Sequence, residues 1–335
     1  MYKERIITRL PKALFGLSLL TVSLSSFAED TKPSFTDYVV ELKQEAKAQG
    51  IPTPLIESAF DGVTYKPRAV KADRSQPEKK LTLDEYIPKA VPDWKVKQAQ
   101  SLYRKHYTDL KRIGDEYGVQ PRFIVALWGV ESNFGTFTGR YKVINALTTM
   151  AYEGRREAFF KTELMAALKI LDEGHIPLSD FKGSWAGAMG QSQFMPTSFL
   201  AYAADGNNDG KKDIWQTKAD VFASTAKYLS DVGWDDEFTW GRQVTIPQSL
   251  DESLQGRDKE KAKKLQEWAA LGVTKLNGQP LPKLADDIDA WLILPDDKAG
   301  RAYLVYNNYN VIMRWNRSYY FALAVSHLAD RITGR

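Results

Sequence analysis

The spacing of apolar residues predicts a mainly helical chain. Over residues 159–171 apolar side chains recur every three or four positions, which predicts a helix with its apolar stripe in the core. Helical patterns also cover 35–49, where Gly50 would end the helix, and 319–331. The whole stretch from 94 to about 240 follows this spacing, so we expect a large α-helical body.

The pattern changes in the last third of the chain. Short runs at 244–247, 290–294 and 303–306 are rich in strand-forming residues and predict strands, and Asn277-Gly278 is a turn signal. Between them, a charged stretch at 258–271 predicts an amphipathic helix. We therefore expect a small β-rich insertion in the α-helical body.

These patterns divide the chain into parts. An N-terminal helical part covers 29–110, in which the polar stretch 66–80 is expected to be an extended linker or arm. A helical core covers 111–242, the β-rich insertion 243–305, and the chain returns to the core over 306–335.

Residues 1–28 have the pattern of a secretory signal peptide. A basic stretch ends at Lys12, an apolar run covers 13–24, and Ser26-Phe27-Ala28 resembles a signal-peptidase site. The run is short for a bilayer-spanning helix, although an uncleaved N-terminal anchor is the alternative. We therefore expect a protein that is soluble in the periplasm after cleavage.

Composition excludes several chemistries. The chain has no cysteine and 3 histidines, which excludes disulfides, a thiolate nucleophile and cysteine-based zinc sites. The formal net charge is +4, of which Lys3, Arg5, Arg9 and Lys12 against Glu4 supply +3, so nucleic acid is not an expected partner. No phosphate-loop or dinucleotide-binding pattern is present.

Glu131 is the candidate catalytic residue. Pro121 suits the first turn of a helix, 123–130 is apolar nearly all the way round, and Gly135 suits a left-handed cap. Glu131 would therefore lie at the C-terminal end of a buried helix. Burial and the negative end of the helix dipole both raise a carboxyl pKa, as a general acid requires. A Glu that only caps or pairs locally is the alternative.

Two further segments could bind ligands. Residues 184–196 mix small residues, neutral polar groups and aromatic rings, which suits a sugar, although a tight interhelical loop would look the same. The segment from 205 to 213 matches the first half of an EF-hand calcium loop, with Gln216 in place of the usual twelfth-position Glu; a plain turn is the alternative. The proposed calcium ligands are Asp205, Asn207, Asp209, the Lys211 carbonyl and Asp220.

Taken together, these segments resemble the lytic murein transglycosylase B family. The resemblance runs from about residue 34 to 330 and rests on long, ordered motifs. They are Val130-Glu131-Ser132-Asn133-Phe134-Gly135, Tyr152-Glu153-Gly154-Arg155-Arg156, Ser184-Trp185-Ala186-Gly187-Ala188-Met189-Gly190, Gln193-Phe194-Met195-Pro196, Asp213-Ile214-Trp215, Gly233-Trp234 and Arg314-Trp315-Asn316-Arg317-Ser318.

The resemblance implies a lysozyme-like helical catalytic core and an enzyme that cleaves the β-1,4 bond between N-acetylmuramic acid and N-acetylglucosamine in peptidoglycan. It implies products with 1,6-anhydro ends and a single catalytic residue, Glu131, that acts first as acid and then as base. No cofactor is expected for the chemistry, and a Ca²⁺ ion is expected only as a structural ligand. The alternatives are a non-catalytic peptidoglycan-binding scaffold and a muramidase that adds water. Partners would be glycan strands, peptide stems and proteins of cell-wall synthesis or remodelling.

The resemblance also implies substrate-binding residues. Arg155 and Arg156 would meet carboxylates of the peptide stem. Trp315 and Phe321 stand where the family commonly has Tyr, so an aromatic surface is kept and Phe321 loses a hydroxyl. The residues that match the glycan groove are Ser184, Gln193, Phe194, Met195, Tyr228, Trp315 and Asn316.

Overall fold

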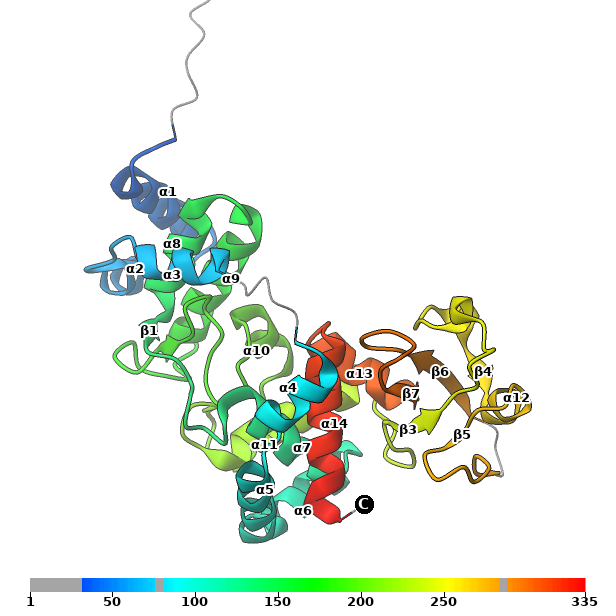
Figure 1. Cartoon of the computed structure of the whole chain (residues 1–335). Coiled ribbons are helices and arrows are strands. Elements are labelled where there is room, and N and C mark those ends of the chain that lie inside the picture. The colour runs from blue at the N-terminus through cyan, green and yellow to red at the C-terminus, as the bar shows by residue number, and fades with distance from the viewer. Residues whose placement is uncertain (1–31, 76–80, 284–287, 335) are drawn as a thin grey trace, which may run out of the picture.

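The structure is a computed structural model that describes residues 32–75, 81–283 and 288–334. The predicted signal peptide at 1–28 lies outside these residues. Across the described part of the chain, no helix combines the length and the apolar character needed to cross a membrane. The mainly α-helical class with a small β-rich part is confirmed (Figure 1).

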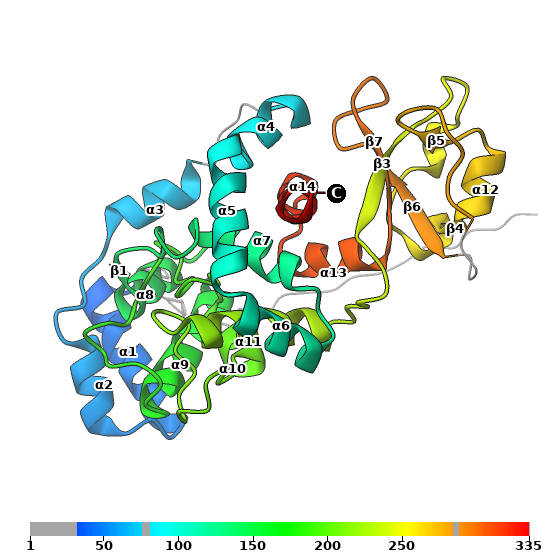
Figure 2. The ribbon, with the colours of Figure 1, turned by 90° about the horizontal axis from the view of Figure 1, so that it is seen from below.

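The centre of the helical body is α7 (Pro121–Ser132), whose residues from Arg122 to Gly129 are all buried. Its apolar surface on every side explains this position, because other helices must cover it all round. The C-terminal helix packs against α7, and Figure 2 shows this C-terminal helix end-on, along its own axis. The covering helices are α5 (Asp93–Lys105), α6 (Tyr107–Tyr117), α11 (Lys218–Asp231) and α14 (Tyr319–Thr333).

A second group of helices packs around α8 and α9 (Figure 1). The predicted stripe of α9 is buried at Phe160, Leu164, Leu168 and Leu171, whereas Phe159 is 44% exposed. These helices share one apolar core with the α7 group. Their bounds are α1 (Phe35–Ala48), α2 (Thr53–Phe60), α3 (Pro67–Arg74), α8 (Val143–Glu153), α9 (Glu157–Asp172) and α10 (Pro196–Tyr202).

The prediction of an extended arm at 66–80 was wrong for its described residues, because 67–74 form helix α3. Pro67 occupies the first helical turn, where its missing N–H costs nothing. Ala69, Val70 and Asp73 are buried, so contacts with the rest of the protein stabilise this short polar helix.

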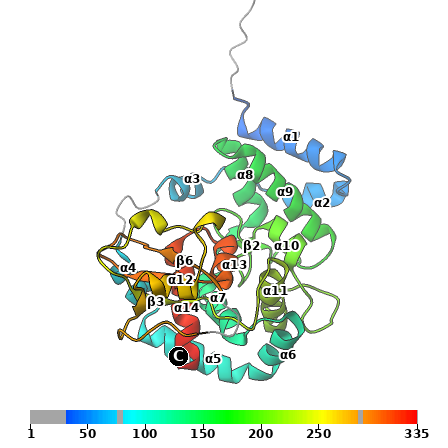
Figure 3. The same ribbon diagram turned by 90° about the vertical axis from the view of Figure 1, so that its right-hand side faces the viewer.

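The C-terminal third contains a five-stranded antiparallel sheet with its own apolar core, on the side of α13 and α14 and far from α1 and α2 (Figures 1 and 3). The three strands predicted from sequence are present as β3, β6 and β7. The strand order is β4-β6-β7-β3-β5. The strands are β3 (Gly241–Thr245), β4 (Lys263–Lys264), β5 (Thr274–Lys275), β6 (Asp289–Ile293) and β7 (Ala302–Val305).

The helix predicted over 258–271 is shorter than expected. Only α12 (Leu265–Ala270) is α-helical, and its apolar residues Leu265 and Trp268 are fully buried. Lys263 and Lys264 instead form the edge strand β4, paired with Ala290 and Asp289 of β6. The charge-rich sequence before α12 therefore includes the edge strand β4, where lysines disfavour pairing with a strand of another molecule.

Two small elements connect the sheet to the helical body. The α4 helix (Leu83–Ala90) starts at a capping box, and the Leu83 N–H donates to the Asp296 carboxylate, which also accepts from the Tyr320 hydroxyl. Arg301 pairs with Asp84 at 2.6 Å. The α13 helix (Asn307–Trp315) follows β7 directly. These contacts place α4 and the end of α13 beside α14.

We predict that Gly129→Ala destabilises the protein by about 1–3 kcal/mol, because overpacking a tight core has costs of this order. A β-carbon at Gly129 would lie 2.6 Å from the Phe134 ring and 3.1 Å from Leu328 of α14. Denaturant unfolding measures the change. Gly174→Ala is the control, because its site is open and only its positive φ of 75° opposes the substitution. Equal stability of Gly129→Ala and the parent would contradict this packing.

Candidate active site

Glu131 lies in the last turn of α7, as predicted. The helix ends earlier than Gly135, because Asn133 (φ 49°) is the left-handed C-cap. The expectation that Gly135 is the cap was therefore wrong. Asn can adopt this conformation at modest cost, so the chain turns away directly after Ser132.

Gln191 fixes the loop at 184–195 to the end of α7. Its side-chain oxygen accepts from the Trp128 indole N–H at 2.9 Å, its amide donates to the Trp215 carbonyl at 2.7 Å, and its backbone carbonyl accepts from the Ser132 hydroxyl at 2.7 Å. Gly135 has a φ of 84°, and a β-carbon there would lie 2.3 Å from the Gln191 side chain. Glycine is required because the two segments approach so closely.

The indole N–H of Trp315, at the end of α13, donates to Oε1 of Glu131 at 2.6 Å. Burial raises the pKa of Glu131 to about 7, although this hydrogen bond opposes the shift. Glu131 remains partly open to solvent, so a substrate can reach it. A carboxyl with this pKa is partly protonated at neutral pH and can act as a general acid. Burial, one of the two causes expected from the sequence, thus acts on Glu131 in the expected direction.

Aromatic rings surround Trp315, the residue whose indole N–H donates to Glu131. The Trp315 ring lies 5.1 Å from that of Phe194 and 4.7 Å from that of Tyr228, between ring centroids. The Tyr202 ring contacts Tyr228 from the other side at 4.6 Å, and burial raises the pKa of Tyr228 to about 12. Met195 is partly buried beside Phe194. The structure therefore brings these sequence-predicted residues together around Trp315.

Tyr86 is a neighbour of Glu131 that the sequence did not indicate. It lies on α4, and its pKa is raised by burial and by the negative charge of Glu131. Its ring meets that of Tyr320 edge to face, with 5.3 Å between centroids. Tyr86 and Glu131 are 45 positions apart in sequence, and nothing in the local pattern of α4 indicated the contact.

Neutral hydrogen-bonding groups come from two segments, the loop at 184–195 and the end of α13. The Ser184 hydroxyl accepts the backbone N–H of Ala188 at 3.0 Å, which leaves its proton to donate elsewhere. Gln193 has a positive φ of 49° and donates to the Gly190 carbonyl at 2.8 Å. Asn316 follows Trp315 and is exposed. Such groups orient a polar, uncharged ligand.

Arg155 and Arg156 lie elsewhere, in the turn between α8 and α9. Both pair with the buried carboxylate of Asp73 on α3, at 2.5 and 3.3 Å. Their side chains remain 59% and 48% exposed. Each guanidinium therefore pairs with Asp73 and keeps a solvent-facing side, and that of Arg156 also lies over the Phe160 ring, 4.8 Å from its centroid.

The loop after α10 folds around its own acidic side chains. The Asp205 carboxylate accepts the N–H groups of Asp209 and Gly210 at 3.1 and 2.7 Å. Asp220, fully buried, accepts those of Gly206 and Asp213 at 2.8 and 2.7 Å. Among the described residues, no group of three or more acidic or histidine side chains is arranged so that it could hold a metal ion by itself. A cation here would also need the amide and carbonyl oxygens of the loop.

A partly buried carboxyl with a raised pKa, beside aromatic rings and neutral hydrogen-bonding groups, is a site typical of enzymes that cleave glycosidic bonds. The family model described as the transglycosylase SLT domain matches residues 34–330. The chain belongs to this family. The predicted lysozyme-like fold and resemblance to the lytic murein transglycosylase B family are thereby confirmed.

Individual proteins that are similar to this chain support its place in the family. The membrane-bound lytic murein transglycosylase B of Escherichia coli is 31% identical over 250 residues, which cover 74% of this chain and 66% of that protein, just under two thirds of its length. The crystal structure of SltB3 from Pseudomonas aeruginosa with NAG-anhNAM-pentapeptide is 42% identical, with a TM-score of 0.87 over 90% of this chain and 80% of that one. Slt35 of Escherichia coli in complex with calcium is 25% identical, with a TM-score of 0.73 over 90% and 93%.

We predict that Glu131→Gln stabilises the protein at alkaline pH. A folded-state pKa of about 7 against the ordinary 4.5 means that folding makes the carboxyl bind its proton more tightly. Stability is then lost as pH rises from 4.5 through 7, by roughly 3 kcal/mol once both states are ionised. Glutamine cannot ionise and keeps the acceptor for Trp315. The melting temperature of the variant should exceed the parent's at pH 8 and match it at pH 4. Equal differences at both pH values would contradict a raised pKa.

Proposed function

We propose that this chain is a lytic transglycosylase that cleaves the bond between N-acetylmuramic acid and N-acetylglucosamine in peptidoglycan and leaves 1,6-anhydro ends. The enzyme class, a lyase acting on peptidoglycan, follows from family membership. The observation that carries the finer proposal is the Glu131 carboxyl, with its pKa of about 7 and its hydrogen bond to Trp315.

In this proposal Glu131 performs both proton transfers. The protonated carboxyl donates to the glycosidic oxygen as the bond from that oxygen to C1 of muramic acid breaks. The carboxylate that results then takes the proton of the C6 hydroxyl as its oxygen bonds to C1. Atoms balance without water, and Glu131 returns to its starting state.

The surroundings of Glu131 support a single carboxyl. Most glycosidases use two, one of which activates water or attacks the sugar. The pKa of Glu131 is shifted by burial and by Trp315, and no neighbouring carboxylate in the described chain contributes. An attacking hydroxyl supplied by the sugar itself needs no second carboxylate.

We assign the glycan to the groups around Trp315. The half-buried Trp315 offers an apolar face to a sugar ring, and the buried rings of Phe194 and Tyr228 pack against it and complete the apolar wall. Ser184, Gln193, Met195 and Asn316 complete the glycan contacts. Arg155 and Arg156 are proposed to bind carboxylates of peptide stems through their solvent-facing sides. The proposed location is the periplasm, where this substrate lies, after removal of residues 1–28.

We also propose that the loop at 205–220 binds calcium for structure. The atoms with which this loop could ligate a cation are all oxygens, which suits Ca²⁺. Burial raises the pKa of Asp220 to about 6, and the negative charges of Asp205 and Asp209 add to this rise, so the three carboxyls repel one another. A divalent cation would relieve that repulsion. The proposed ligands are Asp205, Asn207, Asp209, the Lys211 carbonyl and Asp220.

We predict that Glu131→Gln folds but releases no muropeptides from peptidoglycan. The amide keeps the shape and cannot donate the glycosidic proton, and general acid–base catalysis alone is worth about 10²–10⁴-fold. The matched control is Glu163→Gln on α9, which changes another buried carboxyl, one that accepts from Thr197 at 2.7 Å. The control should keep most activity.

Mass spectrometry of the parent's products separates the candidates. Anhydro ends support the proposal, reducing ends indicate a muramidase that adds water, and absence of products indicates a binding protein. Glu131→Gln activity above a tenth of the parent's would also overturn the role of Glu131.

We predict that calcium raises the melting temperature without being needed for cleavage. Binding at 100 times the dissociation constant adds about 2.7 kcal/mol to the free energy of unfolding. Asp209→Ala should abolish this response, whereas Asp172→Asn, outside the loop, should keep it. A chelated parent whose melting temperature ignores millimolar calcium would show that the loop is only a turn.

A further inference from the structure

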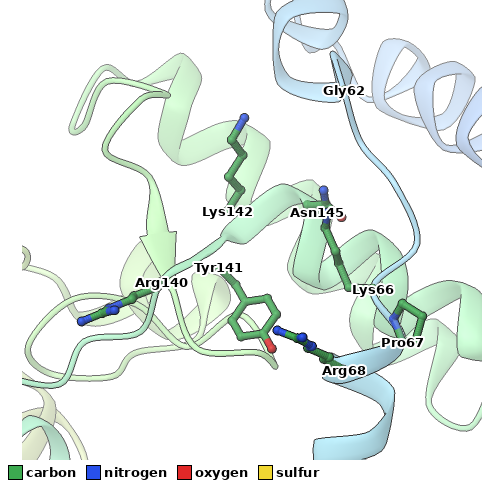
Figure 4. A pocket seen from close by; sticks show the side chains of 8 residues that line it. All are labelled: Gly62, Lys66, Pro67, Arg68, Arg140, Tyr141, Lys142 and Asn145. Carbon is green, nitrogen blue, oxygen red and sulfur yellow. The ribbon is translucent and has the colours of Figure 1, made fainter.

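Four basic side chains line a cavity that does not include Glu131. The cavity, of about 730 Å³, lies between the start of α3 and the segment that leads from β1 into α8 (Figure 4). None of its lining residues is acidic. They are Gly62, Lys66, Pro67, Arg68, Arg140, Tyr141, Lys142 and Asn145.

The four cations in this cavity differ from Arg155 and Arg156. Both of those arginines pair with Asp73, whereas within the described residues no carboxylate lies within ion-pair distance of Lys66, Arg68, Arg140 or Lys142. Lys66 donates to the Thr64 hydroxyl, a neutral partner. The cavity therefore concentrates positive charge that an anionic ligand would neutralise.

Asn145 gives a second, independent sign of a ligand. Its side chain is 5% exposed and lines the cavity, and its Oδ1 has no hydrogen-bond partner. A buried acceptor without a donor costs about 1–3 kcal/mol, which a ligand N–H group would recover. The ligand that fits thus carries both carboxylates, for the cations, and N–H groups, for Asn145.

The backbone adds to the attraction for anions. Lys142 is the N-cap of α8 and Lys66 is that of α3, and neither side chain caps its helix. Both helices therefore begin at the cavity without a side-chain cap, although the Val143 N–H of α8 donates to the Phe181 carbonyl.

The cavity is also joined to the glycan-binding segment. Tyr141 of β1 (Tyr141–Lys142) pairs with Gly183 of β2 (Lys182–Gly183), and Ser184 is the next residue. Paired residues lie about 4.5–5.5 Å apart and adjacent ones about 3.8 Å, whereas five extended residues span up to about 16–18 Å. A peptide attached to a sugar near Ser184 can therefore reach the cavity.

We propose that this cavity binds the carboxylate-bearing end of a peptidoglycan peptide stem, with Arg68, Arg140 and Lys142 on the carboxylates and Asn145 on a peptide N–H. This assignment rests on the proposed function, since it takes the stem to be attached to a glycan held near Ser184. The carboxylate contacts in the cavity come in addition to those proposed for Arg155 and Arg156.

The test uses Glu131→Gln, which should bind without cleaving. Calorimetry would compare three probes: a disaccharide pentapeptide, the same molecule with its carboxylates amidated, and the disaccharide alone. Amidation should weaken binding at least tenfold. Arg68→Gln with Arg140→Gln should weaken binding of the carboxylate form severalfold and leave the other two probes unchanged. Arg104→Gln with Lys105→Gln on α5 is the charge-matched control and should change nothing.

Separate outcomes identify each failure. If the disaccharide and both peptides fail to bind, the proposed function fails. If all three bind but amidation or the cavity variant has no effect, the cavity assignment is overturned. Loss of the carboxylate preference in Arg155→Gln with Arg156→Gln alone would also overturn it. Asn145→Asp adds a negative charge at nearly constant shape. It should reduce the preference for carboxylates, and its melting temperature at the assay pH checks that the variant folds; an undiminished preference counts against the cavity.

Discussion

The active site depends on the attachment of Gln191 to the end of α7. Through its side chain and backbone this residue joins Trp128 and Ser132, one turn apart on α7, to the loop that carries Ser184, Gln193 and Phe194. The contact buries the side-chain polar groups of Trp128, Ser132 and Gln191, and each of these groups has a hydrogen-bond partner. Because it fixes the loop beside the helix end, Glu131 and the glycan-binding groups keep one geometry before any substrate arrives.

That geometry has a cost in stability which serves the chemistry. A carboxyl at the end of a buried helix, surrounded by Trp315 and its neighbouring rings, would be more stable as a neutral amide. The same burial keeps the proton on Glu131 near neutral pH. Trp315 moderates this, since its N–H favours the charged form that must exist between the two proton transfers. Stability and activity therefore oppose each other at this position.

Sequence patterns predicted what depends on local structure. The apolar run after Pro121 placed Glu131 correctly, because a helix with apolar residues all round must be buried. Tyr86 was missed because only tertiary packing brings α4 to the site. The helix at 67–74 was also missed, since its stability comes from contacts with the rest of the protein and its sequence is polar. Likewise, nothing in the sequence indicated that Asp73 would neutralise Arg155 and Arg156.

The central claim is that burial keeps a substantial fraction of Glu131 protonated at neutral pH. Its most direct test is an NMR titration of the carboxyl carbon of Glu131 in the intact protein, assigned by its absence in Glu131→Gln. We expect a midpoint near 7, as the burial of this group requires. A midpoint near 4.5 would contradict the account, because Glu131 would then be ionised at neutral pH and could not donate the proton.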